Sequence, residues 1–183
     1  VERLDLPVTV VDAGLAEPTA APTVSVEASP GGDLRSAAAV PQAADVFEAG
    51  LGYGRALPTD DPVLLGESVP GGTTTALGVL NALGERGTVS SSLPDNPLDR
   101  KRAVVAEGLD ASGLTDGGAA GDSIAAVRAM GDPVLAAGAG IALGAIESGT
   151  PLTLAGGTQL LALAALLRHD GVESPLSLAT TAF

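Results

Sequence analysis

The residues best suited to chemistry in this 183-residue sequence lie in one segment, Gly66–Ala76, which reads Gly-Glu-Ser-Val-Pro-Gly-Gly-Thr-Thr-Thr-Ala. Glycines let backbone amides approach a ligand closely, and threonine hydroxyls add donors at the electropositive start of a helix, a combination that suits phosphate. The segment is neither a P-loop, because no lysine follows the glycines, nor a dinucleotide-binding fingerprint. Taken alone, it is explained equally well as a strand-to-helix turn without a ligand.

Three further features lie where loops follow expected strands or precede helices. Glu67 is at the carboxyl end of an expected strand, where ligands of open α/β sheets bind. A carboxylate beside a phosphate is unfavourable unless it has a task, such as holding ribose hydroxyls. The loop Thr88–Pro97 offers three serine hydroxyls, although a plain capped loop explains its spacing better. The loop Leu154–Gln159 again places glycines and a polar pair between a strand and a helix.

The remaining ionisable residues indicate structural roles. We interpret Asp132 mainly as a helix cap, and His169, the only histidine, as a solvated residue at a helix C-terminus. The pair Asp60-Asp61 resembles a surface turn. The absence of cysteine excludes disulfides, thiolate ligands and a cysteine nucleophile. No cluster has the spacing of metal ligands, so we expect neither a metal nor another cofactor.

The elements that must position these residues alternate between strand and helix. Short, unalternating apolar runs predict strands at Pro7–Val11, Val63–Leu65, Pro151–Leu154 and Leu176–Ala179. Helical patterns cover Pro41–Gly50, Thr73–Leu83, Leu98–Leu109, Asp122–Met130 and Pro133–Ile146, with N-caps at Asn96, Asp122 and Asp132. The segments Glu17–Ala38 and Ser112–Gly121 are predicted loops. This order predicts an α/β fold with a doubly wound, mainly parallel sheet and helices on both faces, a Rossmann-like three-layer arrangement.

Composition narrows the classes of partner. The net charge of −13 comes from 22 acidic and 9 basic residues, and Lys101 is the only lysine. This balance argues against nucleic acid or an anionic membrane as a partner, because both need a basic surface. Many acidic residues, scarce lysine and 2% aromatics are typical of salt-loving organisms, with an ordinary acidic protein as the alternative. The lack of cysteine and of a signal peptide favours the cytoplasm.

Two segments bear on how the chain is organised. The twenty uncharged residues Ser148–Leu167 are long enough for a membrane span, but glycines and polar residues in their middle indicate strand, turn and helix start. The chain begins with Val1 rather than methionine. We therefore expect residues 1–183 to form a single α/β domain from the central part of a longer protein.

With these segments together, the chain resembles the nicotinate-nucleotide:dimethylbenzimidazole phosphoribosyltransferase family, most closely its archaeal branch. The resemblance is carried by Gly66–Ala76, by Ser90-Ser91-Ser92 with Asn96-Pro97, by Gly131-Asp132-Pro133 and by Ala155–Gln159, in matching order and spacing. It implies transfer of phosphoribose from nicotinate mononucleotide to a base such as dimethylbenzimidazole, for the lower ligand of cobamides. The residues that inherit substrate contact are Gly66, Glu67, Gly71, Gly72, Thr73, Thr74, Ser90, Ser91, Gly156, Gly157 and Thr158.

The resemblance also implies what these residues lack. Bacterial members place a catalytic glutamate, the general base, in a glycine-flanked motif near their C-terminus, and no such motif precedes Phe183. We expect the general base outside this chain and assign neither Glu147 nor Glu173 to it. The family suggests a homo-oligomer. The alternatives to an enzyme are a protein that binds or senses a nucleotide without turnover, and a structural α/β domain.

Overall fold

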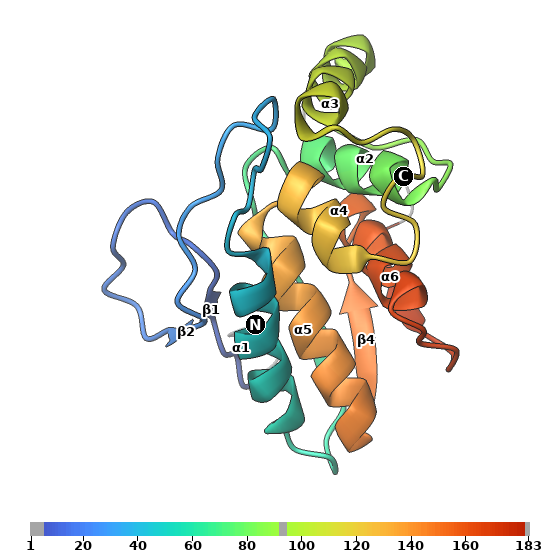
Figure 1. Cartoon of the computed structure of the whole chain (residues 1–183). Coiled ribbons are helices and arrows are strands. Elements are labelled where there is room, and N and C mark those ends of the chain that lie inside the picture. Colours follow the sequence, from blue (N-terminus) through green and yellow to red (C-terminus); the bar gives the residue numbers. More distant parts are fainter. Residues whose placement is uncertain (1–5, 92–94, 182–183) are drawn as a thin grey trace.

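The computed structural model describes residues 6–91 and 95–181, and Figure 1 shows its course. In chain order the elements are β1 (Val11–Asp12), β2 (Val24–Ser25), α1 (Ala43–Arg55), β3 (Val63–Leu65), α2 (Gly72–Leu83), α3 (Leu98–Ser112), α4 (Ser123–Met130), α5 (Pro133–Ser148), β4 (Leu152–Ala155), α6 (Thr158–His169) and β5 (Ser177–Ala179). Strands and helices follow one another without strict alternation, because four helices lie between β3 and β4.

Strands β3, β4 and β5 form a parallel sheet in that order, with Leu65 beside Leu154 and Leu154 beside Leu178. Helices α2 to α5 lie in the connection from β3 to β4, and α6 lies in the connection from β4 to β5. Because the strands are parallel, the loops that follow β3 and β4 leave from the same edge of the sheet. The α/β class and the parallel sheet predicted from the sequence are confirmed.

The two faces of this sheet have different surroundings. Leu154, in the central strand, is 1% exposed and belongs to a core that includes Leu160 and Leu163 of α6. Leu65 packs against the same core. Leu64 is on the opposite face, since successive strand residues alternate, and it is 65% exposed. The sequence predicted helices on both faces; in the described residues the face with Leu154 is the covered one.

Helices α1 and α5 run side by side with their backbones close together (Figure 1). A Cβ on Gly140 would lie 2.1 Å from the carbonyl oxygen of Phe47, and one on Gly54 would lie 2.2 Å from that of Ile141. The small residues of α5 therefore allow a close contact with α1. Helix α1 extends beyond its predicted end at Gly50, and Gly54 in this extension fits against α5.

The N-terminal strand prediction was wrong in position. Only Val11 of the predicted run belongs to β1, which pairs in parallel with β2 inside a predicted loop. The pair is held by hydrogen bonds from Val24 N to Val10 O and from Val26 N to Asp12 O. Proline cannot donate to such a ladder, so the beginning of the run, at Pro7, was a poor strand candidate.

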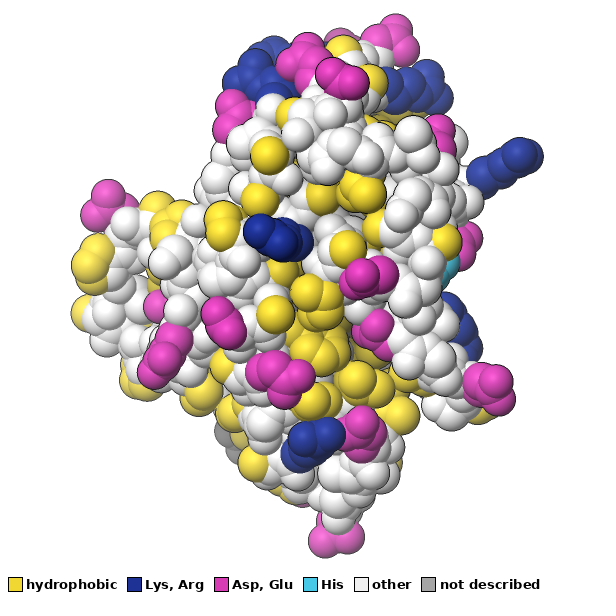
Figure 2. All heavy atoms as spheres, viewed as in Figure 1, with side chains coloured by type: hydrophobic (Ala, Val, Ile, Leu, Met, Phe, Trp, Pro, Cys, Tyr) yellow, Lys and Arg dark blue, Asp and Glu magenta, His cyan; other side chains and the backbone are white. Residues whose placement is uncertain are grey.

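Two surface features complete the description. In the described parts of the chain, no helix is long and apolar enough to cross a membrane, and the uncharged stretch 148–167 is divided mainly between β4 and α6. Figure 2 shows acidic side chains spread over the visible face, with basic ones at the α3 end and others singly elsewhere. Helix α3 carries Arg100, Lys101 and Arg102 in succession near its start.

Candidate functional site

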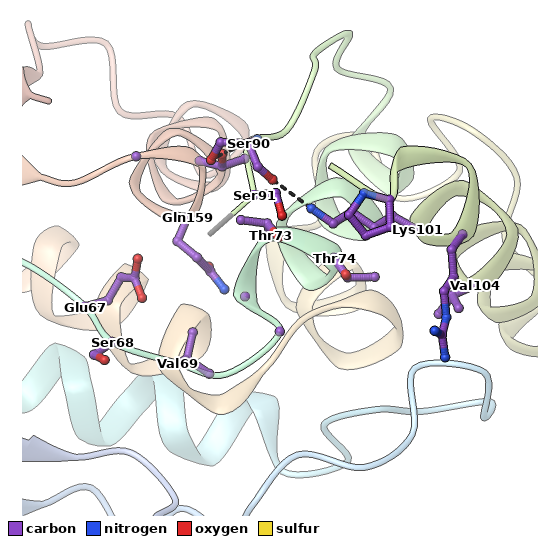
Figure 3. Close-up of a pocket in the computed structure, with 16 residues that line it drawn as sticks. Glu67, Ser68, Val69, Thr73, Thr74, Ser90, Ser91, Lys101, Val104 and Gln159 are labelled. Carbon is purple, nitrogen blue, oxygen red and sulfur yellow. Dashed lines mark hydrogen bonds between the residues drawn. The ribbon is translucent and has the colours of Figure 1, made fainter. Parts of the chain in front are cut away.

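A cavity of about 770 Å³ lies where the loops after β3 and β4 meet α3 (Figure 3). Small-molecule sites usually measure about 300–1,000 Å³. Four separate segments line it, and their residues are Glu67, Ser68, Val69, Gly71, Gly72, Thr73, Thr74, Ser90, Ser91, Pro97, Arg100, Lys101, Val104, Gly157, Thr158 and Gln159.

The glycine-rich loop forms one wall and ends in the N-terminus of α2. Gly71, the N-cap residue, has φ 77°, a left-handed conformation that favours glycine, and no side chain caps the helix. A Cβ on Gly72 would lie 2.6 Å from Nε2 of Gln159, so glycine is required there by packing. The first turn faces the cavity with the hydroxyls of Thr73 and Thr74. Its Gly72 N and Thr74 N donate to the backbone oxygens of Val69 and Gly71.

The N-terminus of α6 forms a second wall. Its N-cap residue, Gly157, also provides no side-chain cap. The hydroxyl oxygen of Thr158, the first helical residue, accepts a hydrogen bond from Ser90 N at 3.1 Å and lies 2.9 Å from Ser90 Oγ. These contacts hold the loop that carries Ser90, here called the serine loop, against α6 and complete the cavity wall.

Lys101 joins the serine loop to α3 and lines the cavity (Figure 3). It is 7% exposed, and its ammonium donates to Ser90 O at 2.7 Å and to Asn96 Oδ1 at 3.0 Å. Burial lowers its pKa. The prediction of Asn96 as an N-cap was wrong: Pro97 is the N-cap residue, and the Asn96 amide donates to Val89 O. The Asn96 side chain is bonded to Lys101 and Val89 instead, so it does not cap α3.

Glu67 lies on the side of the cavity away from Lys101 (Figure 3). Partial burial raises the pKa of its carboxyl, the nearby charge of Asp132 raises it further, and a hydrogen bond from the backbone of Val69 opposes both effects. A carboxyl with a raised pKa inside a cavity is a common feature of functional sites.

A buried polar cluster lies behind the loop. Asp132 is the N-cap of α5, as predicted, and its Oδ1 accepts from Leu135 N at 2.9 Å. Its Oδ2 accepts from Thr75 Oγ1 at 2.5 Å and from Gln159 Nε2 at 2.7 Å. Gln159 Nε2 also lies 3.1 Å from Thr75 Oγ1. The cluster therefore joins the N-termini of α2, α5 and α6.

The structure brings most of the sequence-predicted site residues to this cavity. Gly66 and Gly156 are the exceptions, since neither lines it. A Cβ on Gly66 would meet Ala155 O at 3.3 Å, and one on Gly156 would meet Leu160 Cδ2 at 2.6 Å, so both glycines allow close packing. The sequence reasoning missed Gln159 and Lys101; being the only lysine was a signal for the latter.

His169 and Asp122 lie outside the cavity. His169 ends α6 as predicted, but it is not simply solvated: Nδ1 accepts from Gly121 N at 2.8 Å, and Nε2 lies 3.1 Å from Glu85 Oε1. Asp122 caps α4 as predicted, accepting from Ala125 N. Among the described residues, no group of three or more His, Asp or Glu side chains is placed to hold a metal ion.

These features define an α/β protein with a cavity at the carboxyl edge of a parallel sheet, between two helix N-termini. The model of a family described as phosphoribosyltransferase (DBI_PRT) matches residues 2–171. The chain belongs to this phosphoribosyltransferase family.

Individual relatives agree with this placement. The UPF0284 protein of Halobacterium salinarum is 56% identical over 174 residues, which cover 95% of this chain and 52% of the relative. The UPF0284 protein of Methanothermobacter thermautotrophicus is 43% identical over 188 residues, covering 100% and 52%. The solved structure of CobT from Thermus thermophilus matches with a TM-score of 0.69 and 26% identity over 94% of this chain and 54% of that chain.

A second solved structure from Thermus thermophilus is a nicotinate-nucleotide-dimethylbenzimidazole phosphoribosyltransferase. It matches with a TM-score of 0.66 and 25% identity, over 88% of this chain and 49% of that chain. The family resemblance inferred from the sequence is confirmed. The chain spans about half the length of the relatives it matches.

Proposed function

We propose that the full-length protein transfers phosphoribose from nicotinate mononucleotide to a base such as dimethylbenzimidazole, for the lower ligand of cobamides. The observation that carries this proposal is the convergence of two uncapped helix N-termini and a buried lysine on one cavity. Family membership and the names of the solved relatives support the choice of reaction.

The phosphate is proposed to bind between the first turn of α2 and Lys101. Thr73 and Thr74 line the cavity here and can offer their hydroxyls, and the helix dipole favours an anion at this end of α2. Two of the three N–H groups of the Lys101 ammonium have acceptors in the described part of the chain, which leaves one for the ligand. A phosphate also offsets the cost of burying this charge.

The ribose is proposed to lie toward Glu67, whose carboxylate can accept hydrogen bonds from sugar hydroxyls. In the reaction, a ring nitrogen of the base forms a bond to C1′ while the bond from C1′ to the nicotinate nitrogen breaks and nicotinate leaves with that electron pair. The proton of the incoming base passes to a general base, which we place outside this chain. The described residues contribute orientation, which can supply much of such a rate enhancement.

The whole protein's setting is part of the proposal. We propose a cytoplasmic homo-oligomer that takes nicotinate mononucleotide and an acceptor base as its partners, without nucleic acid or a membrane surface. The composition of the chain supports this setting through its strongly acidic balance.

The test is release of nicotinate by the full-length protein when nicotinate mononucleotide and dimethylbenzimidazole are supplied together, followed by chromatography. We expect base-dependent release of nicotinate and formation of one riboside phosphate. Binding of the mononucleotide without turnover across several azole bases would instead favour a nucleotide-binding or sensing protein. Absence of both binding and turnover would overturn the proposal.

A further inference from the structure

Helix α3 presents one face to the cavity. Its residues Arg100, Lys101 and Val104 line the cavity together with its N-cap, Pro97. They follow Pro97 by three, four and seven positions, a spacing that places side chains along a single side of a helix. Figure 3 shows Lys101 and Val104 on this helix beside the cavity. Two successive cations of α3 therefore border the same space.

These two cations are held very differently. The Lys101 ammonium is buried and donates to Ser90 O and Asn96 Oδ1. The Arg100 side chain is exposed, and it makes no ion pair or hydrogen bond in the part of the chain that the structure describes. Its acidic neighbour Asp99 pairs with Arg102 instead, at 3.5 Å. The guanidinium of Arg100 is therefore available to a ligand in the cavity.

The charge of a phosphate monoester fits two such cations. At pH 7 the group carries between 1.5 and 2 negative charges, by analogy with phosphorylated side chains, for which about −1.5 to −2 is typical. The Lys101 ammonium can balance one of these charges. A guanidinium is a planar fork of donors that binds two phosphate oxygens at once. A phosphate bonded to Lys101 lies on the side of α3 to which Arg100 also belongs.

We propose that Arg100 is a second phosphate-binding cation, whose guanidinium pairs with the phosphate held by Lys101 and the start of α2. The inference rests on the proposed function, since it takes the ligand to be a mononucleotide. Because Arg100 is exposed and Lys101 is buried, Arg100 contacts the phosphate from the solvent side. Helix α3 thereby selects ligands with a doubly charged terminal phosphate.

The experiment compares three probes by calorimetric titration of the full-length protein. They are nicotinate mononucleotide, nicotinate riboside, which lacks the phosphate, and nicotinamide mononucleotide, which lacks the ring carboxylate. Arg100→Met should weaken binding of both mononucleotides by about five- to tenfold at low salt, between the effects of an exposed ion pair and of a charge-assisted hydrogen bond. Binding of the riboside should not change. The two mononucleotides alone decide between phosphate and carboxylate if the riboside binds too weakly to measure.

Arg102→Met is the matched control. It removes the same charge from the same helix, but Arg102 is exposed and does not line the cavity. Binding of all three probes should remain unchanged in this variant. Arg100→Lys should restore part of the lost affinity, because it keeps the charge and loses the fork.

Salt separates the role of Arg100 from that of Lys101. Between about 0.05 and about 0.5 M KCl, the effect of Arg100→Met on nicotinate mononucleotide binding should shrink, because ions screen an exposed pair strongly. The effect of Lys101→Met should persist, since buried pairs are screened much less. An effect of Arg100→Met that does not depend on salt would overturn its placement on the solvent side.

The remaining outcomes separate this inference from the proposed function. If Arg100→Met binds nicotinate mononucleotide as tightly as the unsubstituted protein, or if Arg102→Met weakens it equally, the role of Arg100 is overturned while the proposed function stands. A loss confined to nicotinate mononucleotide and nicotinate riboside would assign Arg100 to the ring carboxylate and overturn the phosphate contact. If nicotinate mononucleotide does not bind at all, the proposed function is overturned, and this inference with it.

Discussion

Glu67 and Lys101 are the cavity residues in which burial acts against the charged form: it raises the pKa of the carboxyl and lowers the pKa of the ammonium. A ligand with both phosphate and hydroxyl groups compensates for this in both places. It offers an anion to the lysine and hydrogen-bond donors to the carboxylate. Binding of such a ligand thereby gives both charged groups a partner.

Glu67→Gln should raise the melting temperature at pH 7 and have no such effect at pH 4. Because the folded-state pKa of Glu67 is raised above its ordinary 4.5, the native state prefers the protonated form. The carboxyl therefore destabilises the fold increasingly as pH rises from about 4.5 through the raised pKa, and glutamine removes this loss. Thermal unfolding of both proteins from pH 4 to 7.5 would measure it. Glu48→Gln, on the exposed surface of α1, is the control.

A Glu67→Gln variant whose advantage is the same at every pH would contradict this account of the carboxyl. The same variant should bind nicotinate mononucleotide more weakly, since it loses a charged acceptor. Stability and binding are thus expected to change in opposite directions.

Lys101→Met should weaken binding of nicotinate mononucleotide by about 10- to 100-fold, which is the usual worth of a charge-assisted hydrogen bond. Calorimetric titration would measure the change. Arg102→Met is the control, because Arg102 is the next cation on α3 and pairs with the exposed Asp99 at 3.5 Å, outside the cavity. Equal effects of the two substitutions would show that only the overall charge of α3 matters.

At the scale of elements, the contact between α1 and α5 fixes the position of the polar cluster behind the cavity. Helix α5 begins at Pro133, directly after Asp132, so its position fixes the carboxylate that holds Gln159. The helices approach so closely because glycines face the partner backbone along the contact. A change in this spacing would move the N-terminus of α5 relative to α2 and α6.

Gly140→Ala should destabilise the protein by about 2 kcal/mol or more, since its methyl group would lie 2.1 Å from Phe47 O and force the helices apart. Gly52→Ala is the matched control. A Cβ at Gly52, on the exposed side of α1, meets nothing within 4 Å, so alanine there should stabilise by about 0.5–1 kcal/mol. Denaturant unfolding of both variants would test the contrast. Two similar shifts would contradict the close approach of these helices.

At the scale of the whole molecule, the acidic surface and the cavity have opposite effects on an anionic ligand. A net charge of −13 repels anions in solution, whereas the cavity is built from helix N-termini and α3 cations. The local donors must therefore outweigh a general repulsion that salt screens within about 10 Å at 0.1 M. Salt should thus favour both folding and binding of an anionic ligand.

The melting temperature should rise by several degrees between 0.05 and about 0.5 M KCl, because screening reduces repulsion among the acidic side chains. Scanning calorimetry at fixed pH would measure the rise. The double variant Asp60→Asn/Asp61→Asn removes two exposed carboxylates and should show a smaller rise. A melting temperature independent of KCl would contradict a significant contribution of self-repulsion.

Several features could be predicted from residues close together in the chain. Val63–Leu65 is a strand as expected, Asp122 and Asp132 cap helices as expected, and the glycine-rich loop joins β3 to α2. Turn chemistry, capping and helix propensity act over a few residues, so the sequence displays them directly. The pairing of β1 with β2 was missed because its two-residue strands leave almost no pattern.

The assembly of the site depended on distant contacts instead. Thr75, Asp132 and Gln159 meet although they are separated by 57, 27 and 84 residues in pairs. Each was explicable locally as a helix residue or a cap. They come together because β3 lies beside β4, which brings the N-termini of α2 and α6 to one edge of the sheet. The proximity of these three residues results from packing of the whole chain, and no local sequence pattern predicts it.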